Sequence, residues 1–162
     1  MIPMKIKNHQ RGLTTVEFAI VGLLLFVTLF GVFEIARMMW VFNALDEVTR
    51  RGARMATVCQ VDDPAIQQVA IFNDSGDAGP SRLIPGLTTG NIELNYLDID
   101  GTTLAEPADV DFAAIEFVQV AITGFQHQVL IPTLFWTMQT PPFRTTLPRE
   151  SLGVSRDGFT PC

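Results

Sequence analysis

The longest hydrophobic stretch of the chain lies near its N-terminus, between Leu13 and Phe33. Its centre, Phe18–Phe33, is a run of sixteen residues without a formal charge, and Glu17 is the one charged residue between Leu13 and Phe33. An α-helix rises about 1.5 Å per residue, so this stretch is about 30 Å long as a helix, the thickness of the hydrocarbon core of a bilayer. The pattern therefore predicts a membrane-spanning helix rather than the buried core helix of a soluble protein.

Beyond Phe33 the hydrophobic positions become periodic, with alternating spacings of four and three residues. The positions at this spacing are Glu34, Met38, Val41, Leu45, Val48, Gly52, Met55 and Cys59. Such spacing places them on one face of a helix, and most charged residues fall on the other faces. No proline occurs between residues 13 and 63. We therefore expect one helix of about 45 residues, apolar on all sides in its first half and amphipathic in its second half.

The rest of the chain alternates turn signals with short regular segments. Asp63 and Pro64 suit the N-cap and the first position of a second helix, in which Gln67 and Gln68 should face outward. An apolar segment that contains a proline occupies 125–136. The alternation or β-branched content typical of strands occurs in three segments, 92–96, 117–123 and 143–147. The predicted fold class is α+β, with a small antiparallel sheet packed on the second half of the long helix.

The distribution of charge predicts an orientation for the helix. Residues 1–12 carry Lys5, Lys7 and Arg11 and no acidic residue, whereas all 17 acidic residues lie at or after Glu17. Short flanks rich in Lys and Arg stay on the cytoplasmic side of a membrane, so the C-terminal part should lie in a periplasm-like space. No lysine follows Lys7, and the formal net charge is −6. This balance excludes a nucleic-acid-binding protein, which needs a basic face.

The chain contains two cysteines, Cys59 and Cys162. In an oxidising compartment an even pair indicates a disulfide, which would tie the C-terminal end of the chain to the end of the long helix. Such a bond would also hold the polar tail 148–162, which is otherwise expected to be irregular. Two unpaired thiols are the alternative, and the sequence favours the disulfide.

The residues around the start of the hydrophobic stretch resemble a class III, prepilin-type signal. Arg11 and Gly12 precede Leu13, and Glu17 is the fifth residue after the Gly12–Leu13 bond. More narrowly, the stretch is similar to the TadE-like minor pilins of tight-adherence (Flp) pili. The resemblance implies that a membrane aspartyl peptidase cuts between Gly12 and Leu13. Glu17 of one subunit would then pair with the new α-ammonium group of a neighbouring subunit.

A second motif strengthens the same resemblance. TadE-like proteins follow their membrane segment with Asn-Ala-Leu and then Arg-x-Gly-Ala-Arg-x-Ala, and 43–45 and 50–56 match this arrangement. The small residues Gly52 and Ala53 imply close helix packing, and Arg54 belongs to the same packing motif. Together the two motifs cover about a third of the chain. The family implies a type IV pilin-like fold.

The sequence also contains a segment that resembles a catalytic motif. Leu97–Thr102 is similar to the Asp-x-Asp-Gly-Thr motif of haloacid-dehalogenase phosphotransferases, in which Asp98 would be the nucleophile and Asp100 the acid or base. That chemistry also needs a downstream basic residue, commonly Lys, and a further acidic pair for Mg²⁺. No lysine follows, and 61 residues remain after Gly101, too few for the alternating β/α sheet that carries such sites. A hairpin turn is the preferred interpretation.

Two weaker signals concern metal ions. Asp98, Asp100, Asp109 and Asp111 could gather around Ca²⁺, but their spacing is not that of an EF-hand, and a solvated acidic loop is preferred. His127 is the one histidine after the first twelve residues, so a zinc site based on histidines is not expected. We predict no catalytic residue, no metal site and no cofactor.

These observations lead to one main hypothesis, a minor pilin or pseudopilin of a tight-adherence system, and to two alternatives. The main hypothesis implies a prepilin peptidase, major and minor pilin subunits, the inner-membrane assembly platform and the lipid bilayer as partners. An unprocessed, membrane-anchored periplasmic scaffolding or binding protein is the first alternative. A membrane-tethered phosphohydrolase that uses Asp98 and Asp100 is the second. The predicted segments are a cytoplasmic leader 1–12, a transmembrane half-helix 13–36, an amphipathic half-helix 37–60 and a periplasmic α+β part 61–162.

Overall fold

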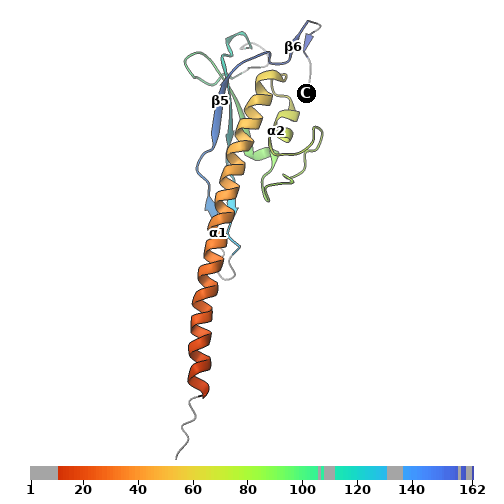
Figure 1. Ribbon diagram of the computed structural model, residues 1–162. Helices are drawn as coiled ribbons and strands as arrows, with labels where there is room; N and C mark the ends of the chain where they lie inside the picture. Colours follow the sequence, from red (N-terminus) through yellow and green to blue (C-terminus); the bar gives the residue numbers. More distant parts are fainter. Residues whose placement is uncertain (1–10, 106, 108–111, 131–136, 157, 160–161) are drawn as a thin grey trace, which may run out of the picture.

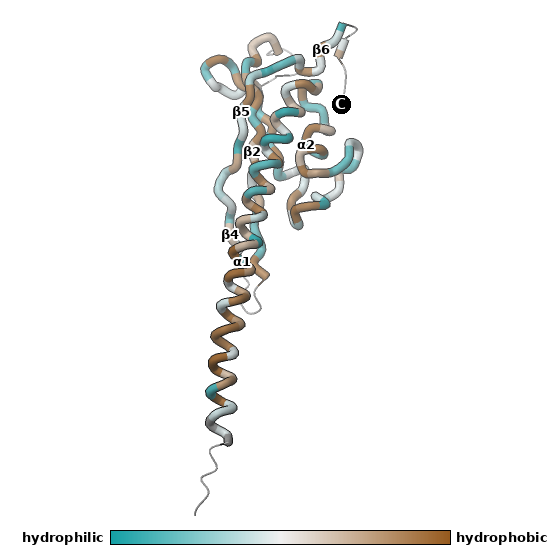
Figure 2. The backbone as a smooth tube through the Cα atoms, viewed as in Figure 1, coloured by the Kyte–Doolittle hydropathy of each residue, from teal (hydrophilic) through white to brown (hydrophobic). Residues whose placement is uncertain are grey.

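The computed structural model describes residues 11–105, 107, 112–130, 137–156, 158–159 and 162. Its dominant element is the helix α1, Arg11–Val58. The first half of α1 extends away from the globular part, and its second half lies along that part (Figure 1). The extended half is the most continuously hydrophobic part of the chain (Figure 2). The prediction of one long N-terminal helix is therefore confirmed.

The globular part combines short helices with short strands. Its elements are α2 (Pro64–Ala70), η1 (Thr89–Asn91), β1 (Ile92–Leu97), η2 (Phe112–Ala114), β2 (Phe117–Ile122), β3 (Gln126–Gln128), β4 (Thr137–Gln139), β5 (Arg144–Pro148), β6 (Val154–Ser155) and β7 (Gly158–Phe159). The α+β class predicted from the sequence is confirmed. The three predicted strands correspond to β1, β2 and β5, with ends that differ by one residue.

An antiparallel sheet of β1, β2 and β5, with β2 in the middle, packs against α1. In β2 every second residue is buried, including Val118 and Val120, because one face of the strand lies in the core. Leu45 and Val48 of α1 belong to the same fully buried cluster. The alternating apolar pattern of β2 and the periodic apolar face of α1 therefore meet to form the core, as the two periodicities require.

Gly52 allows the helix to approach the sheet and α2 closely. A Cβ at this position would lie 3.1 Å from the Ala70 Cβ and 3.1 Å from a Val120 methyl carbon. Contacts this short leave little room for a side chain. The glycine of the second sequence motif is therefore placed at the point where three elements of the globular part converge.

The helix α2 begins as predicted, but one of its faces was misassigned. Asp63 caps the helix, its Oδ1 accepting a hydrogen bond from the Ala65 amide at 2.9 Å, and Pro64 is the first helical residue. Gln68, however, is buried, and its Oε1 accepts a hydrogen bond from the Gly76 amide at 2.5 Å. The prediction that Gln68 faces outward is wrong, because this side chain holds the loop that follows α2.

The C-terminal tail closes the end of α1. The Thr57 and Val58 carbonyls, which have no partner within the helix, accept hydrogen bonds from the Leu152 amide at 3.0 Å and the Gly153 amide at 2.8 Å. Cys59 and Cys162 form a disulfide with their Cα atoms 5.6 Å apart. The tail also contains the short paired strands β6 and β7, and the disulfide holds its end, as the sequence predicted for a bonded pair of cysteines.

A second small sheet lies beside the middle of α1. The strands β3 and β4 pair antiparallel, with His127 opposite Met138. These strands come from the apolar segment predicted at 125–136 and the residues just after it, and 131–136 lie outside the described residues. Strands of three residues carry too little alternation to be recognised in a sequence, which is why this pair was not predicted.

Candidate functional site: the exposed helix and its junction

The first half of α1 presents a hydrophobic surface in every direction. Large apolar side chains are exposed along the helix from Val16 to Trp40. Among the described residues one helix is long and apolar enough to span a membrane, and none of its most apolar eighteen-residue window is buried. Exposure of this extent is costly in water, since burying one such side chain is worth about 1.5–3 kcal/mol. The surface is therefore compatible with a membrane anchor.

The residues predicted to direct processing and assembly lie at the start of this helix. Gly12 is helical, and nothing lies within 4 Å of the position that a Cβ would occupy. Glu17 is exposed on the helix surface, four residues beyond Leu13. In the described part of the chain, this end of α1 extends away from the globular part (Figure 1). Their roles in cleavage and in pairing between subunits stay predictions.

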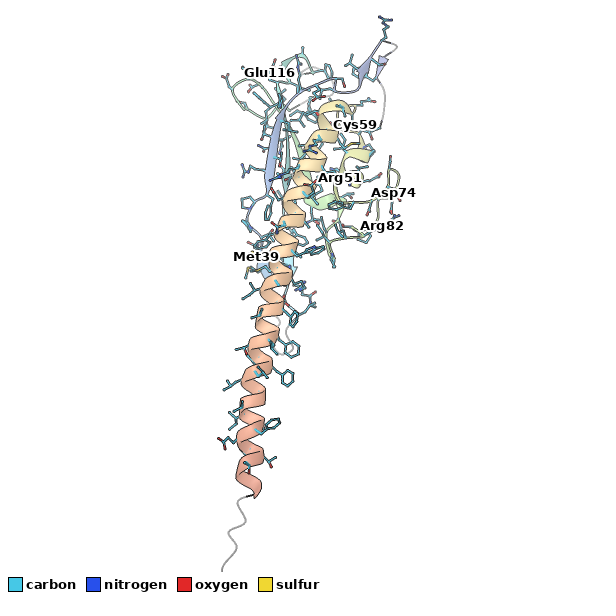
Figure 3. The ribbon with its side chains drawn as sticks, viewed as in Figure 1. Met39, Arg51, Cys59, Asp74, Arg82 and Glu116 are labelled. Carbon is cyan, nitrogen blue, oxygen red and sulfur yellow. A yellow bond between two sulfur atoms is a disulfide. The ribbon has the colours of Figure 1, made fainter. Side chains whose placement is uncertain are left out.

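The second motif serves packing within the chain. Gly52 and Ala53 are buried against the globular part, whereas Arg54 is exposed. Arg51 lies over the ring of Phe72, with its guanidinium carbon 5.3 Å from the ring centroid (Figure 3 labels Arg51). Such a cation–π contact is worth about 0.5–1 kcal/mol at an exposed site. The Arg51 guanidinium therefore lies against an aromatic ring of the segment that follows α2.

A polar cluster that sequence reasoning missed lies where the extended half of α1 meets the globular part. Arg37 donates hydrogen bonds to the Glu34 carboxylate and to the Gln128 carbonyl of β3. His127 is buried, and its Nε2 lies 3.5 Å from Glu34 Oε1 without a hydrogen bond. The backbone amide of Leu130 also interacts with the Glu34 carboxylate. We call these residues the junction cluster.

The junction cluster borders a cavity of about 290 Å³ whose lining includes Arg37, Val41, Phe125 and His127. The sequence did contain a signal for this cluster. Glu34 occupies an apolar position of the periodic face, and a carboxylate at such a position needs a partner. The partner on α1 could have been identified from the spacing, because residues three apart face each other on a helix. The contacts with β3 depend on the tertiary fold.

The residues of the catalytic-looking motif form a turn. Asp98 Oδ1 accepts hydrogen bonds from the Asp100 amide at 3.0 Å and the Thr102 amide at 2.8 Å. Asp109 and Asp111, the other candidates for a Ca²⁺ site, lie outside the described residues. Within the described part of the chain no three His, Cys, Asp or Glu side chains come together in a way that could hold a metal ion. The Asp98 carboxylate stabilises its own loop.

Comparison with known proteins finds a match to a family model in the N-terminal part of the chain. Residues 12–54 match the family model of the TadE-like proteins. The match begins at the glycine of the predicted cleavage site and ends within the second motif, so it covers most of both sequence motifs. No curated protein and no solved structure matches the chain. Over residues 12–54, which form most of α1, the chain is therefore similar to the TadE-like proteins.

Proposed function

We propose that this protein is a minor pilin, or pseudopilin, that takes part in the assembly of tight-adherence pili. The observation that carries the proposal is the exposed apolar half of α1, joined to a folded globular part and lying within the segment that matches the TadE-like family. Residues 13–36 would span the inner membrane, with 1–12 in the cytoplasm and 61–162 in the periplasm. Subunit packing, rather than catalysis, would be the work of the helix.

In the proposed assembly pathway, a prepilin peptidase first removes residues 1–12. Cleavage would create an α-ammonium group on Leu13, at the end of a hydrophobic helix. A charge alone in lipid is costly, and the cost falls when an opposite charge pairs with it. Glu17 of a neighbouring subunit would supply that charge, and the ion pair would set the axial stagger of adjacent helices. The partners would be major and minor pilins and the inner-membrane assembly platform. The assembled pili would serve surface attachment and biofilm formation.

The proposal can be tested by counting pili on a bacterial strain that lacks this protein but retains the rest of the pilus system. Restoring the wild-type protein should restore pili, counted by electron microscopy, and Glu17→Ala should restore few or none. Glu47→Ala is the matched control, because Glu47 is also an exposed glutamate of α1 but lies beside the globular part. Equal piliation with and without the protein, or full piliation by Glu17→Ala, would contradict the proposed role.

A further inference from the structure

Leu130, which follows β3, presents an exposed hydrophobic side chain beside α1. Leu130, two residues beyond β3, is 67% exposed, although its backbone amide interacts with the Glu34 carboxylate. Arg37 donates a hydrogen bond to the carbonyl oxygen of Gln128, two residues before Leu130. These two contacts fix Leu130 at the level of Glu34, directly after the uncharged run ends at Phe33.

Two further exposed hydrophobic residues lie on α1 within two helical turns of Glu34. Met39 is 55% exposed and Trp40 is 47% exposed. Successive residues of an α-helix are rotated by about 100°, so Met39 is displaced by about 140° from Glu34 in one direction and Trp40 by about 120° in the other. Leu130 lies on the Glu34 side. The three side chains, which we call the apolar collar, therefore point in three well-separated directions around the helix axis (Figure 3 labels Met39).

The arrangement of the apolar collar distinguishes between two kinds of partner. A protein partner that docks on one side covers one sector of a helix, and it would leave at least one of these side chains in water. A bilayer surrounds a helix on all sides at one level. The collar spans about 9 Å along α1, from Glu34 to Trp40, which is close to the thickness of about 5–8 Å of the interfacial region on one side of a membrane. Tryptophan is also enriched at this depth, since its ring is apolar and its N–H is polar.

The junction cluster fits the same level. Glu34 and Arg37 would be costly in hydrocarbon, but they are bonded to each other, and Arg37 is also bonded to β3. Exposed backbone groups of a strand also need water or headgroups, so the β3–β4 sheet cannot lie deeper than the interface. From these observations we infer that the globular part rests on the bilayer through the apolar collar, with Leu130 in the headgroup region as a second membrane contact beside the anchor helix. The inference rests on the membrane anchoring in the proposed function.

Site-directed spin labelling in nanodiscs of phosphatidylethanolamine and phosphatidylglycerol tests this contact on the full chain. Both cysteines of the chain are in the disulfide, so one introduced cysteine can be labelled selectively. The variants are Leu130→Cys, Ile99→Cys and Leu25→Cys, all at exposed hydrophobic positions. Ile99 lies in a turn of the globular part and Leu25 in the middle of the proposed span. Collisions with oxygen report lipid, and collisions with a water-soluble nickel chelate report water.

The label at position 130 should lose most of the nickel accessibility seen at position 99 while gaining oxygen accessibility, with position 25 the most lipid-exposed. Equal nickel accessibility at 130 and 99, with 25 still in lipid, would overturn the membrane contact and leave the anchoring intact. Protection of 130 that arises only after pilin subunits are added would assign Leu130 to a protein partner and also overturn the inference. Nickel accessibility at position 25 would overturn the proposed anchoring together with the membrane contact.

Discussion

At the scale of single residues, Gly153 packs tightly against Gln60, just beyond the end of α1. Its φ is +75°, and a Cβ there would lie 2.6 Å from the Gln60 amide nitrogen and 2.7 Å from the Gln60 Cα. Gly101 has a similar φ of +80°, but nothing lies within 4 Å of its Cβ position. Substituting alanine at Gly101 therefore measures the cost of a left-handed backbone alone, whereas the same substitution at Gly153 adds the cost of a steric clash.

We predict that Gly153→Ala destabilises the protein more than Gly101→Ala. The left-handed conformation alone should cost about 1–2 kcal/mol in either variant. At Gly153 the clash with backbone atoms, which cannot move as a flexible side chain does, should add roughly 1–3 kcal/mol. The free energy of unfolding in denaturant, measured on the detergent-solubilised chain, checks the difference. Equal losses in the two variants would show that the tail does not pack against the end of α1 as described.

Tyr96 is the one tyrosine of the chain, and it is fully buried. Its hydroxyl oxygen accepts a hydrogen bond from the Asp62 amide at 3.1 Å. Burial disfavours the charged tyrosinate and raises the pKa of Tyr96 to about 12, above its ordinary value of 10.0. Because the chain has one tyrosine, the absorbance of tyrosinate reports this pKa directly.

Stability should therefore fall with rising pH between about 10 and 12. In this window the unfolded chain loses the Tyr96 proton while the folded chain retains it, so deprotonation favours unfolding. The contribution is complete below pH 10 and amounts to roughly 2–3 kcal/mol. The absorbance of tyrosinate as a function of pH gives the folded-state pKa, and Tyr96→Phe should remove this part of the pH dependence. An ordinary pKa near 10 in the folded chain would contradict the burial of this side chain.

At the scale of elements, α1 carries two ion pairs that differ in their surroundings. Glu34 and Arg37 are partly shielded from solvent and Arg37 is bonded to β3, whereas the pair of Asp46 and Arg50 is about half exposed. Exposed pairs of this kind contribute about 0.3–0.5 kcal/mol. Hydrogen bonds to charged groups in partly buried sites contribute more, about 1.5–3 kcal/mol.

Arg37→Ala should therefore loosen the attachment of β3 to α1, and Arg50→Ala should not. We expect Arg37→Ala to lower the free energy of unfolding by about 1–3 kcal/mol and Arg50→Ala to lower it by less than about 0.5 kcal/mol. Hydrogen exchange locates the effect, since amides of β3 and β4 should exchange faster only in Arg37→Ala. Unchanged exchange in these strands would mean that the junction cluster does not hold the small sheet.

The disulfide joins the end of α1 to the C-terminal residue across a sequence separation of 103 residues. Closing a loop of this length reduces the entropy of the unfolded chain by an amount worth about 4–5 kcal/mol in the chain-entropy model. Cys162→Ser should lower the free energy of unfolding by roughly 2–5 kcal/mol. Cys59→Ser with Cys162→Ser should cost little more than Cys59→Ser alone, because one bond is lost in each case. A negligible loss in Cys162→Ser would contradict a stabilising role of the bond.

At the scale of the whole molecule, the elements that the sequence specified are those with a long, regular period. The α1 helix is apolar on all sides through its first half and repeats its apolar positions regularly through its second half, and β2 alternates buried and half-buried residues along its whole length. Local chemistry was sufficient for the α2 start, because Asp63 and Pro64 act on adjacent backbone groups.

Features that depend on distant residues were not predictable in the same way. Gln68 is buried because a loop eight residues later needs its oxygen, and its own neighbours give no sign of that need. His127 meets Glu34 only after β3 docks beside α1. The strands of the tail follow from the attachment of Leu152 and Gly153 to the end of α1. Each of these contacts joins segments that are distant in the sequence, and the local pattern of either segment does not show that the two meet in the fold.

The proposed fate of the whole chain depends on cleavage between Gly12 and Leu13. The most direct measurement is the N-terminal sequence and intact mass of the protein produced together with its prepilin peptidase, alongside Gly12→Leu. A minor pilin should begin at Leu13, and Gly12→Leu should retain residues 1–12. A chain that begins at Met1 in both proteins would contradict the minor-pilin proposal and favour an unprocessed, membrane-anchored scaffolding or binding protein.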